Sequence, residues 1–200
     1  MAKHVDYYVS LNSPWTYLAS KRLEVMARKY NADVTIWPVD FGSVFAVSGG
    51  LPLPKRAPQR QAYRMMELKR WRDAVGVKLT LEPKFFPANE VPAARCVIAL
   101  REQGRMADAI KVAHAVLHAL WAEEKNTGDP ETLKAIVAGC GLDADAVMKA
   151  GEAPEMAAKR EEYTKAAIEK GVFGAPFFII DGEGFWGQDR LDFVERKLAS

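Results

Sequence analysis

The sequence predicts an α/β fold in which two segments of β-sheet flank a long helical insertion. Three observations predict it: a strand–helix–strand pattern opens the chain, consecutive helices without strands fill its middle, and a strand–turn–strand–helix pattern closes it. The 200 residues are 49% hydrophobic and 27% charged, which suffices for one sizeable core. This composition excludes a disordered chain, a collagen-like repeat and a small disulfide scaffold.

The N-terminal pattern is a strand, a helix and a second strand. Residues 4–11 mix aromatic and β-branched side chains, which predicts a largely buried strand. Asn12-Ser13-Pro14 is a turn, and apolar side chains at helical spacing predict a helix over 15–29. Residues 32–41 alternate again and predict a second strand, parallel to the first. Ser13 is therefore expected where the first strand ends and the first helix begins.

The middle of the chain is expected to be mainly helical. Residues 49–58 are rich in glycine and proline and mark a long loop or the entry to an insertion. Residues 77–92 contain three prolines and are expected to be extended or looped. The segments with helical patterns are 59–76, 93–102, 106–124, 130–137, 144–150 and 154–170.

The C-terminal pattern returns to β-structure. Residues 177–180 and 184–186 predict a hairpin around Asp181-Gly182, and residues 190–198 predict a closing helix. The order βαβ, helical insertion, ββα, with a proline directly before the hairpin, is the thioredoxin-like arrangement. We therefore expect a thioredoxin-like domain formed by residues 1–48 and 171–200, and an inserted α-helical domain formed by residues 49–170.

The charge balance argues against a nucleic-acid surface. The chain has 28 Lys and Arg against 26 Asp and Glu, a formal net charge of +2. The basic run over 55–72 is interleaved with Tyr63 and Trp71, which could suggest nucleic acid. A solvated helix face, with one or two positive groups turned toward an anionic ligand, is the favoured interpretation. Gly49-Gly50 is followed by Leu-Pro, so no glycine-rich phosphate loop is expected.

The cysteines and histidines do not predict a redox or metal centre. Cys96 and Cys140 lie far apart and form no C-x-x-C pair. His114 and His118 are four residues apart, but no glutamate of an H-E-x-x-H motif and no third ligand accompany them. The sequence contains no signal-peptide pattern and no apolar run of membrane-spanning length, so we expect a cytoplasmic protein without membrane contact. Any thiol chemistry would need an external thiol.

Ser13 has two interpretations. It can cap the first helix, its hydroxyl accepting from a first-turn N–H, with Pro14 at the first helical position. The same helix N-terminus has free N–H groups that favour an anion such as a thiolate, and the hydroxyl can donate to a sulfur atom brought by a cofactor. The two roles can alternate as a ligand arrives and leaves.

Two C-terminal features also have two interpretations each. Ala175-Pro176 is either a trans proline that starts an edge strand or a cis proline that turns the Ala175 backbone toward a peptide ligand. Asp189 is either the N-cap of the final helix, with Arg190 as a solvated first-turn residue, or the carboxylate that takes the ammonium of a zwitterionic amino-acid head.

Six motifs in order make the chain resemble the 2-hydroxychromene-2-carboxylate isomerases, relatives of the kappa-class glutathione transferases in the DsbA-like branch of the thioredoxin superfamily. They extend over nearly the whole chain. The motifs are Asp6-Tyr7-Tyr8 with Ser13-Pro14-Trp15 and Tyr17-Leu18-Ala19, Tyr63 to Trp71, Phe86-Pro87 with Asn89, Ala119 to Glu123, Val172 to Pro176, and Trp186 to Leu191.

The resemblance implies a glutathione-dependent enzyme in which Ser13 occupies the position of the nucleophilic cysteine of thiol–disulfide oxidoreductases. Ser13 would hydrogen-bond the sulfur of reduced glutathione and hold it as a thiolate. The Ala175 backbone, before cis Pro176, would bind the cysteinyl unit. Asp189 with Gln188 would bind the γ-glutamyl end, and Arg60 matches a lysine that meets the glycyl carboxylate in kappa-class relatives.

The implied reaction interconverts 2-hydroxychromene-2-carboxylate and trans-o-hydroxybenzylidenepyruvate by reversible thiolate addition. Its substrate pocket would be aromatic, with polar groups for the substrate carboxylate and with Asn12 where relatives commonly have a bulky apolar residue. The pocket candidates are Asn12, Phe86, Trp121 and Trp186, with Asn89, Arg64 and Arg95 for the carboxylate.

A kappa-like glutathione transferase or peroxidase on other electrophiles, and a non-catalytic glutathione- or peptide-binding module, are the alternative functions. Relatives are commonly dimers, so we expect a homodimer that acts on a small aromatic or conjugated electrophile.

Overall fold

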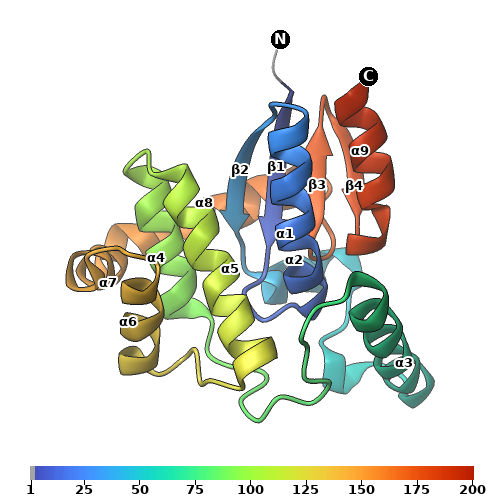
Figure 1. Ribbon diagram of the computed structural model, residues 1–200, viewed down its shortest axis with the longest axis horizontal. Coiled ribbons are helices and arrows are strands. Elements are labelled where there is room, and N and C mark those ends of the chain that lie inside the picture. The colour runs from blue at the N-terminus through green and yellow to red at the C-terminus, as the bar shows by residue number, and fades with distance from the viewer. Residues whose placement is uncertain (1–2) are drawn as a thin grey trace.

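A four-stranded sheet with helices on both faces forms the centre of the computed structural model, which describes residues 3–200 (Figure 1). β1 (His4–Val9) lies between β2 (Asp33–Pro38), to which it is parallel, and β3 (Phe177–Ile180), to which it is antiparallel. β4 (Glu183–Trp186) pairs antiparallel with β3 at the sheet edge. The predicted α/β sheet with a parallel first pair and a returning hairpin is confirmed.

Apart from α2 (Phe41–Ser48), the helices follow the predicted order. They are α1 (Pro14–Lys29), α2 (Phe41–Ser48), α3 (Pro58–Val75), α4 (Val91–Glu102), α5 (Met106–Glu123), α6 (Pro130–Gly139), α7 (Ala144–Glu152), α8 (Pro154–Glu169) and α9 (Leu191–Ala199), with 3-10 turns at Leu53–Lys55 and Gln188–Arg190. Between residues 49 and 170 the elements that the structure describes are all helical. The domain boundaries expected at 48/49 and 170/171 cut no helix or strand, and the division into two domains stays a prediction.

The prediction of a strand over 32–41 is wrong at its C-terminal end. β2 ends at Pro38, and Asp40 starts the unpredicted helix α2. The Asp40 carboxylate accepts from the Gly42 backbone N–H at 2.9 Å and from the Ser43 hydroxyl at 2.7 Å. The apolar residues after Pro38 continue the strand pattern. Asp40 nevertheless favours a helix there, because a capping side chain satisfies the free N–H groups of the first turn. The first strand likewise ends at Val9, two residues before the predicted end.

Side chains of β1 alternate between two apolar cores. Val5, Tyr7 and Val9 join the larger core together with side chains of α1, α5 and α9. Tyr8, on the other face, joins a smaller core with side chains of α2 and α8. The Tyr7 ring stacks on Phe178 of β3, with ring centroids 5.3 Å apart. Burial of both faces explains the apolar run Tyr7-Tyr8-Val9 at the end of this strand.

The helix α3 is the peripheral element of the insertion. Figure 1 shows α3 apart from the group formed by α4 to α8. Leu68 is its one fully buried side chain, whereas α4 and α5 each bury several. The remaining contacts of α3 with the body are made by partly buried side chains such as Met65 and Trp71.

His114 connects α5 to α1 in its neutral form. Its Nδ1 lies 2.6 Å from the Ser20 hydroxyl, and its ring stacks on Tyr17 with centroids 5.9 Å apart. Burial, together with the nearby Lys21 and His118, lowers the pKa of His114 from 6.5 to about 4, against an opposing effect of Glu24. Protonation of this imidazole therefore opposes the packing of the two helices.

We expect the free energy of unfolding to decrease as the pH falls from about 6.5 toward about 4, because the unfolded chain binds a proton at His114 that the folded protein excludes. A tenfold change in proton affinity corresponds to about 1.4 kcal/mol, so the change of the His114 pKa from 6.5 to about 4 limits the decrease due to His114 to about 3.5 kcal/mol. Urea unfolding at pH 7 and pH 5 measures it. His114→Gln should reduce the decrease and the control His118→Gln should not; equal decreases in both variants would contradict this role.

Candidate active site

Ser13 lies at the predicted junction between β1 and α1. Its backbone is extended, and Pro14 occupies the first helical position. The Ser13 hydroxyl accepts from the Thr16 backbone N–H at 3.1 Å, which confirms the N-cap interpretation. The same hydroxyl donates to the Ala175 carbonyl at 3.4 Å. The serine therefore caps α1 and also faces the segment that precedes β3.

The sheet register brings Ala175 and Pro176 to Ser13. β3 runs antiparallel to β1 with Tyr8 opposite Phe177, so the residues after β1 meet the residues before β3. The Ala175–Pro176 peptide bond is cis, in agreement with the second interpretation of this pair. The Pro176 carbonyl accepts from the Gly187 backbone N–H at 2.9 Å, which brings the end of β4 to the same place.

The N-cap interpretation of Asp189 is wrong. Asp189 lies inside the 3-10 turn Gln188–Arg190, and the N-cap position of α9 is occupied by Arg190 without a side-chain hydrogen bond. The cause is Gly187, whose φ of +106° turns the chain so that the helix begins later. The Asp189 carboxylate is exposed and lies 3.4 Å from the Arg190 guanidinium. It remains accessible to an external ammonium group.

Gln188 supports this turn from inside the protein. Its side chain is buried, and its Oε1 accepts from the Arg22 guanidinium at 2.7 Å. The Gln188 backbone carbonyl accepts from the same guanidinium at 3.2 Å. Because Arg22 belongs to α1, these two bonds fix the turn that carries Asp189 relative to the helix that carries Ser13.

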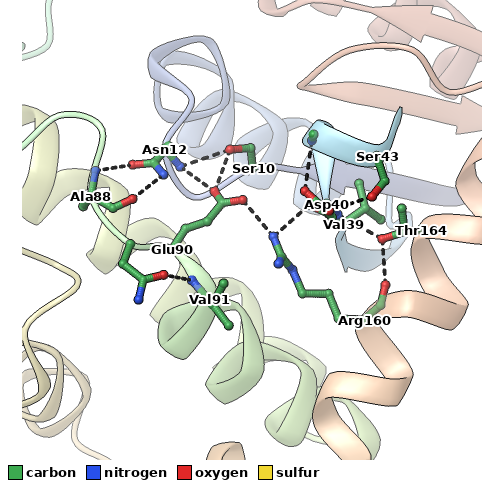
Figure 2. Close-up of polar contacts among 12 residues, drawn as sticks. Ser10, Asn12, Val39, Asp40, Ser43, Ala88, Glu90, Val91, Arg160 and Thr164 are labelled. Atoms are coloured by element: carbon green, nitrogen blue, oxygen red, sulfur yellow. Dashed lines mark hydrogen bonds and ion pairs between the residues drawn. The ribbon is translucent and has the colours of Figure 1, made fainter. Parts of the chain in front are cut away.

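The loop before Ser13 is held by a polar network centred on Glu90 (Figure 2). Glu90 Oε2 accepts from the Ser10 hydroxyl at 2.7 Å and from the Asn12 backbone N–H at 3.1 Å. The Asn12 side chain donates to the Ala88 carbonyl at 2.8 Å and accepts from the Ala88 N–H at 3.0 Å. Asn12, a predicted pocket residue, therefore joins the loop before Ser13 to the segment before α4.

Arg160 of α8 completes the network. It donates to Glu90 Oε1 at 2.9 Å and to the Val39 carbonyl at 3.4 Å, and both side chains of the ion pair are largely buried. Burial raises the pKa of the Glu90 carboxyl, although the Ser10 hydroxyl, the Arg160 charge and the Asn12 N–H oppose the increase. The loop before Ser13 and the helix α8 thus converge on one carboxylate beside the candidate site.

The structure brings three of the predicted pocket residues together. The Arg64 guanidinium carbon lies 5.5 Å from the centroid of the Phe86 ring and 6.0 Å from that of Trp121. The Phe86 and Trp121 rings are 4.9 Å apart, and Trp121 is fully buried. We call these three residues the Arg64 cluster.

The other predicted residues lie in separate surroundings. Trp186 is 53% exposed at the end of β4 and packs on Phe173. Asn89 is exposed and accepts from the Val91 N–H at 3.2 Å, and Arg60 is exposed in the first turn of α3. Arg95 lies on α4 with a buried Nε that has no partner within residues 3–200. None of these four makes a hydrogen bond to Ser13 in the described part of the chain.

A hollow in another part of the molecule contains none of these residues. Its volume is about 830 Å³, and it is lined by side chains of α5 and α6, among them His114, His118, Ile136 and Cys140. None of the predicted site residues lines it. Because Ser13 and Ala175 are held together by hydrogen bonding at another place, we assign the candidate site to them and not to this hollow.

Both cysteines are buried and unpaired within residues 3–200. Burial raises the pKa of the Cys96 thiol to about 11, and burial also raises the pKa of Cys140. The described residues contain no group of three or more His, Cys, Asp or Glu side chains that could hold a metal ion. Over the same residues, no helix combines the length and the apolar character needed to span a membrane.

Sequence reasoning missed Glu90, Arg160 and Arg22. Glu90 precedes a helix, where an acidic residue is common, so nothing in the local pattern marks it. Arg160 and Arg22 belong to helices rich in charged side chains, and their partners are 70 and 166 residues away in the chain. Such pairs follow from the tertiary fold alone.

Comparisons with known proteins cover the whole chain. The family model of the DSBA-like thioredoxin domain matches residues 4–199. The chain is 32% identical to a 2-hydroxychromene-2-carboxylate isomerase of Sphingobium xenophagum, over 99% of each chain. It is 31% identical to a protein of the same name from Pseudomonas putida, over 98% of this chain and 94% of the relative.

Solved structures give the same result. The selenomethionine form of a 2-hydroxychromene-2-carboxylate isomerase is similar with a TM-score of 0.81, at 30% identity, over 98% of this chain and 94% of the other. A cytosolic disulfide reductase from Pseudomonas aeruginosa has the same fold, with a TM-score of 0.69 at 17% identity over 98% of each chain. The predicted DsbA-like thioredoxin fold is confirmed.

Replacing Glu90 by Leu is expected to destabilise the protein by about 3 kcal/mol, because it leaves the largely buried Arg160 charge without its partner. Urea unfolding of the purified variant measures this loss. The double variant Glu90→Leu/Arg160→Met should recover part of it.

The matched control is Glu24→Gln, which removes a helix-surface ion pair with Lys21 and Arg28 and should cost at most about 1 kcal/mol. If Glu90→Leu lowers the free energy of unfolding no more than Glu24→Gln does, the Glu90 network contributes no more stability than a surface ion pair.

Proposed function

The chain belongs to the DSBA-like thioredoxin-domain family and within it to the 2-hydroxychromene-2-carboxylate isomerases, and from this membership we propose that it is a glutathione-dependent isomerase. The proposed reaction interconverts 2-hydroxychromene-2-carboxylate and trans-o-hydroxybenzylidenepyruvate. The observation that carries the proposal is the Ser13 hydroxyl, which caps α1 and lies 3.4 Å from the Ala175 carbonyl.

The residues around Ser13 fit a thiol-bearing tripeptide. A helix N-terminus favours a negative charge, so the first turn of α1 would stabilise a thiolate near Ser13. The Ala175 carbonyl, now an acceptor for Ser13, would accept instead from a backbone N–H of the tripeptide. The chain's own thiols are buried with raised pKa values, which supports an external source of the reactive sulfur.

The two ends of glutathione would meet residues of opposite charge. The exposed Asp189 carboxylate would bind the ammonium of the γ-glutamyl end, and the exposed Arg60 would bind the glycyl carboxylate. Gln188 is buried on Arg22, so we propose that Gln188 acts by holding the turn that carries Asp189. Pro176 would contribute by its carbonyl bond to Gly187, which keeps this turn beside Ala175.

Bound glutathione would supply a thiolate for reversible addition to a conjugated carbon. The ring C–O bond of the chromene would open, with the hemiketal proton passing to the phenol oxygen, and the former double bond could then rotate as a single bond. Loss of the thiolate would restore the double bond in the trans isomer, so no net oxidation occurs. The Ser13 hydroxyl would exchange its bond to Ala175 for a bond to sulfur and keep the sulfur ionised. The Glu90 network would hold the Ser13 loop in place during this exchange. The Arg64 cluster would exclude water and accommodate an aromatic ring.

The expected homodimer and the cytoplasmic location stay predictions. Light scattering of the purified protein at several concentrations would measure the oligomeric state. A monomer at all concentrations would overturn the first expectation without affecting the proposed reaction.

Ser13→Ala is expected to lower the turnover of 2-hydroxychromene-2-carboxylate with reduced glutathione by about 100-fold or more, since the loss of one donor to a reacting anion costs about 10²–10³ in rate. Loss of the helix cap should also cost about 1 kcal/mol of stability. An absorbance assay measures turnover, and calorimetry with glutathione tests whether binding persists.

The control is Ser43→Ala, which removes a hydroxyl from the first turn of α2 and should leave turnover unchanged. Unchanged turnover in Ser13→Ala would exclude a catalytic serine. A full rate without glutathione would exclude the cofactor, and accumulation of a stable conjugate would indicate a transferase.

Asp189→Asn is expected to raise the KM for glutathione about tenfold with little change in kcat, because a hydrogen bond between charged groups contributes about 1.5–3 kcal/mol. Asp192→Asn, in the first turn of α9, is the control for a general loss of negative charge. Steady-state kinetics at saturating chromene measure both. An equal effect of the two substitutions would contradict a specific contact.

A further inference from the structure

Arg64 is held in a partly buried position by aromatic rings. Its guanidinium lies over the Phe86 ring and near the Trp121 ring, and these contacts attach the peripheral helix α3 to the body of the protein. A cation over an aromatic face is favourable, and more so when water is displaced. The two aromatic rings therefore hold the guanidinium in one position, which a freely solvated side chain would not keep.

This guanidinium has no carboxylate partner within residues 3–200. Its one recorded side-chain hydrogen bond is to the Met65 sulfur at 3.7 Å, a weak acceptor. Arg22 and Arg160, which are also partly buried, each donate to a side-chain oxygen. Burial and the charge of Arg56 lower the pKa of Arg64 to about 10, so the folded protein maintains an uncompensated positive charge there.

A second donor in the same cluster also lacks an oxygen acceptor within residues 3–200. Trp121 is fully buried, and its indole Nε1–H has no hydrogen-bond partner in the described part of the chain. A buried donor without an acceptor typically costs about 1–3 kcal/mol. A guanidinium whose recorded side-chain hydrogen bond is to a thioether sulfur, and an indole N–H without an acceptor, both lie beside the Phe86 ring. Together they indicate a guest that combines oxygen acceptors with a flat apolar body.

The Arg64 cluster adjoins the loop that carries Ser13. Phe86 is two residues before Ala88, whose N–H and carbonyl are both bonded to the Asn12 side chain. Asn12 directly precedes Ser13. A bicyclic guest on Phe86 would therefore lie on the segment that the Asn12 side chain joins to the loop before Ser13.

We propose that Arg64 binds the carboxylate of an aromatic acid substrate and so sets the orientation of that substrate relative to Ser13. The planar guanidinium fork matches a carboxylate in a bidentate manner, and the Phe86 ring provides the surface for the substrate ring. Arg95, another candidate for this role from the sequence, has a partnerless Nε but no recorded contact with an aromatic ring within residues 3–200. The proposal rests on the proposed function and specifies its substrate class.

Kinetics of Arg64→Met and Arg64→Lys test the proposal. For 2-hydroxychromene-2-carboxylate, Arg64→Met should raise KM at least about tenfold, and Arg64→Lys should raise it less because it keeps the charge. The KM for glutathione should change less than about twofold in both. Arg70→Met, which removes an exposed arginine of the same helix, is the control and should behave as the wild type. A raised KM for glutathione instead would assign Arg64 to the tripeptide site and overturn the proposal.

A binding measurement separates this proposal from the isomerase reaction. Calorimetry of the wild type with trans-cinnamate and with its neutral amide should show a preference of about tenfold for the carboxylate, and Arg64→Met should abolish that preference. If cinnamate binding depends on Arg64 but no chromene is isomerised, the role of Arg64 in carboxylate binding is supported and the proposed reaction is wrong. The opposite result is an active isomerase in which Arg64→Met has the melting temperature of the wild type and alters neither the KM for the chromene nor cinnamate binding. That result would show that Arg64 does not bind the substrate carboxylate.

Discussion

The pairing of β1 with both β2 and β3 is the constraint on which the candidate site depends. A strand with two hydrogen-bonded neighbours cannot shift its register without moving its apolar side chains to the wrong face of the sheet. This fixes the end of β1 next to the start of β3, so Ser13 and Ala175 meet although they are 162 residues apart. The side-chain alternation of Val5, Tyr7 and Val9 against Tyr8 thus determines where the hydroxyl lies.

The helical residues contribute to the site by clamping its loops. Glu90 and Arg160 come from the insertion, yet their hydrogen bonds end on Ser10, Asn12 and Val39 of the N-terminal segment. A largely buried ion pair is costly unless its remaining donors and acceptors are satisfied. Here the loop before Ser13 satisfies the Glu90 carboxylate and Val39 accepts from Arg160, whereas the Arg160 Nε has no partner within residues 3–200. The geometry of that loop is therefore part of what keeps the pair favourable (Figure 2).

Local pattern was sufficient to predict most of the fold and the position of Ser13. Strand alternation, proline positions and the Asp181-Gly182 turn depend on neighbours in sequence, and the structure agrees with them. The prediction failed where a local signal was ambiguous: Asp40 caps a helix inside an apolar run, and Gly187 delays the start of α9 past Asp189. Glu90, Arg160 and the unpaired state of Arg64 could not be predicted, because each depends on partners or neighbours brought in by tertiary packing.

The burial of both cysteines has a further consequence for a protein that is proposed to act on conjugated electrophiles. A thiol that is exposed and ionised would be alkylated by such a substrate and would inactivate its own protein over many turnovers. Cys96 and Cys140 are shielded from solvent and largely protonated at neutral pH. If bound glutathione is alkylated, it can dissociate and be replaced by a fresh molecule. Because the protein's own thiols are unreactive, alkylation by the substrate would not inactivate the protein.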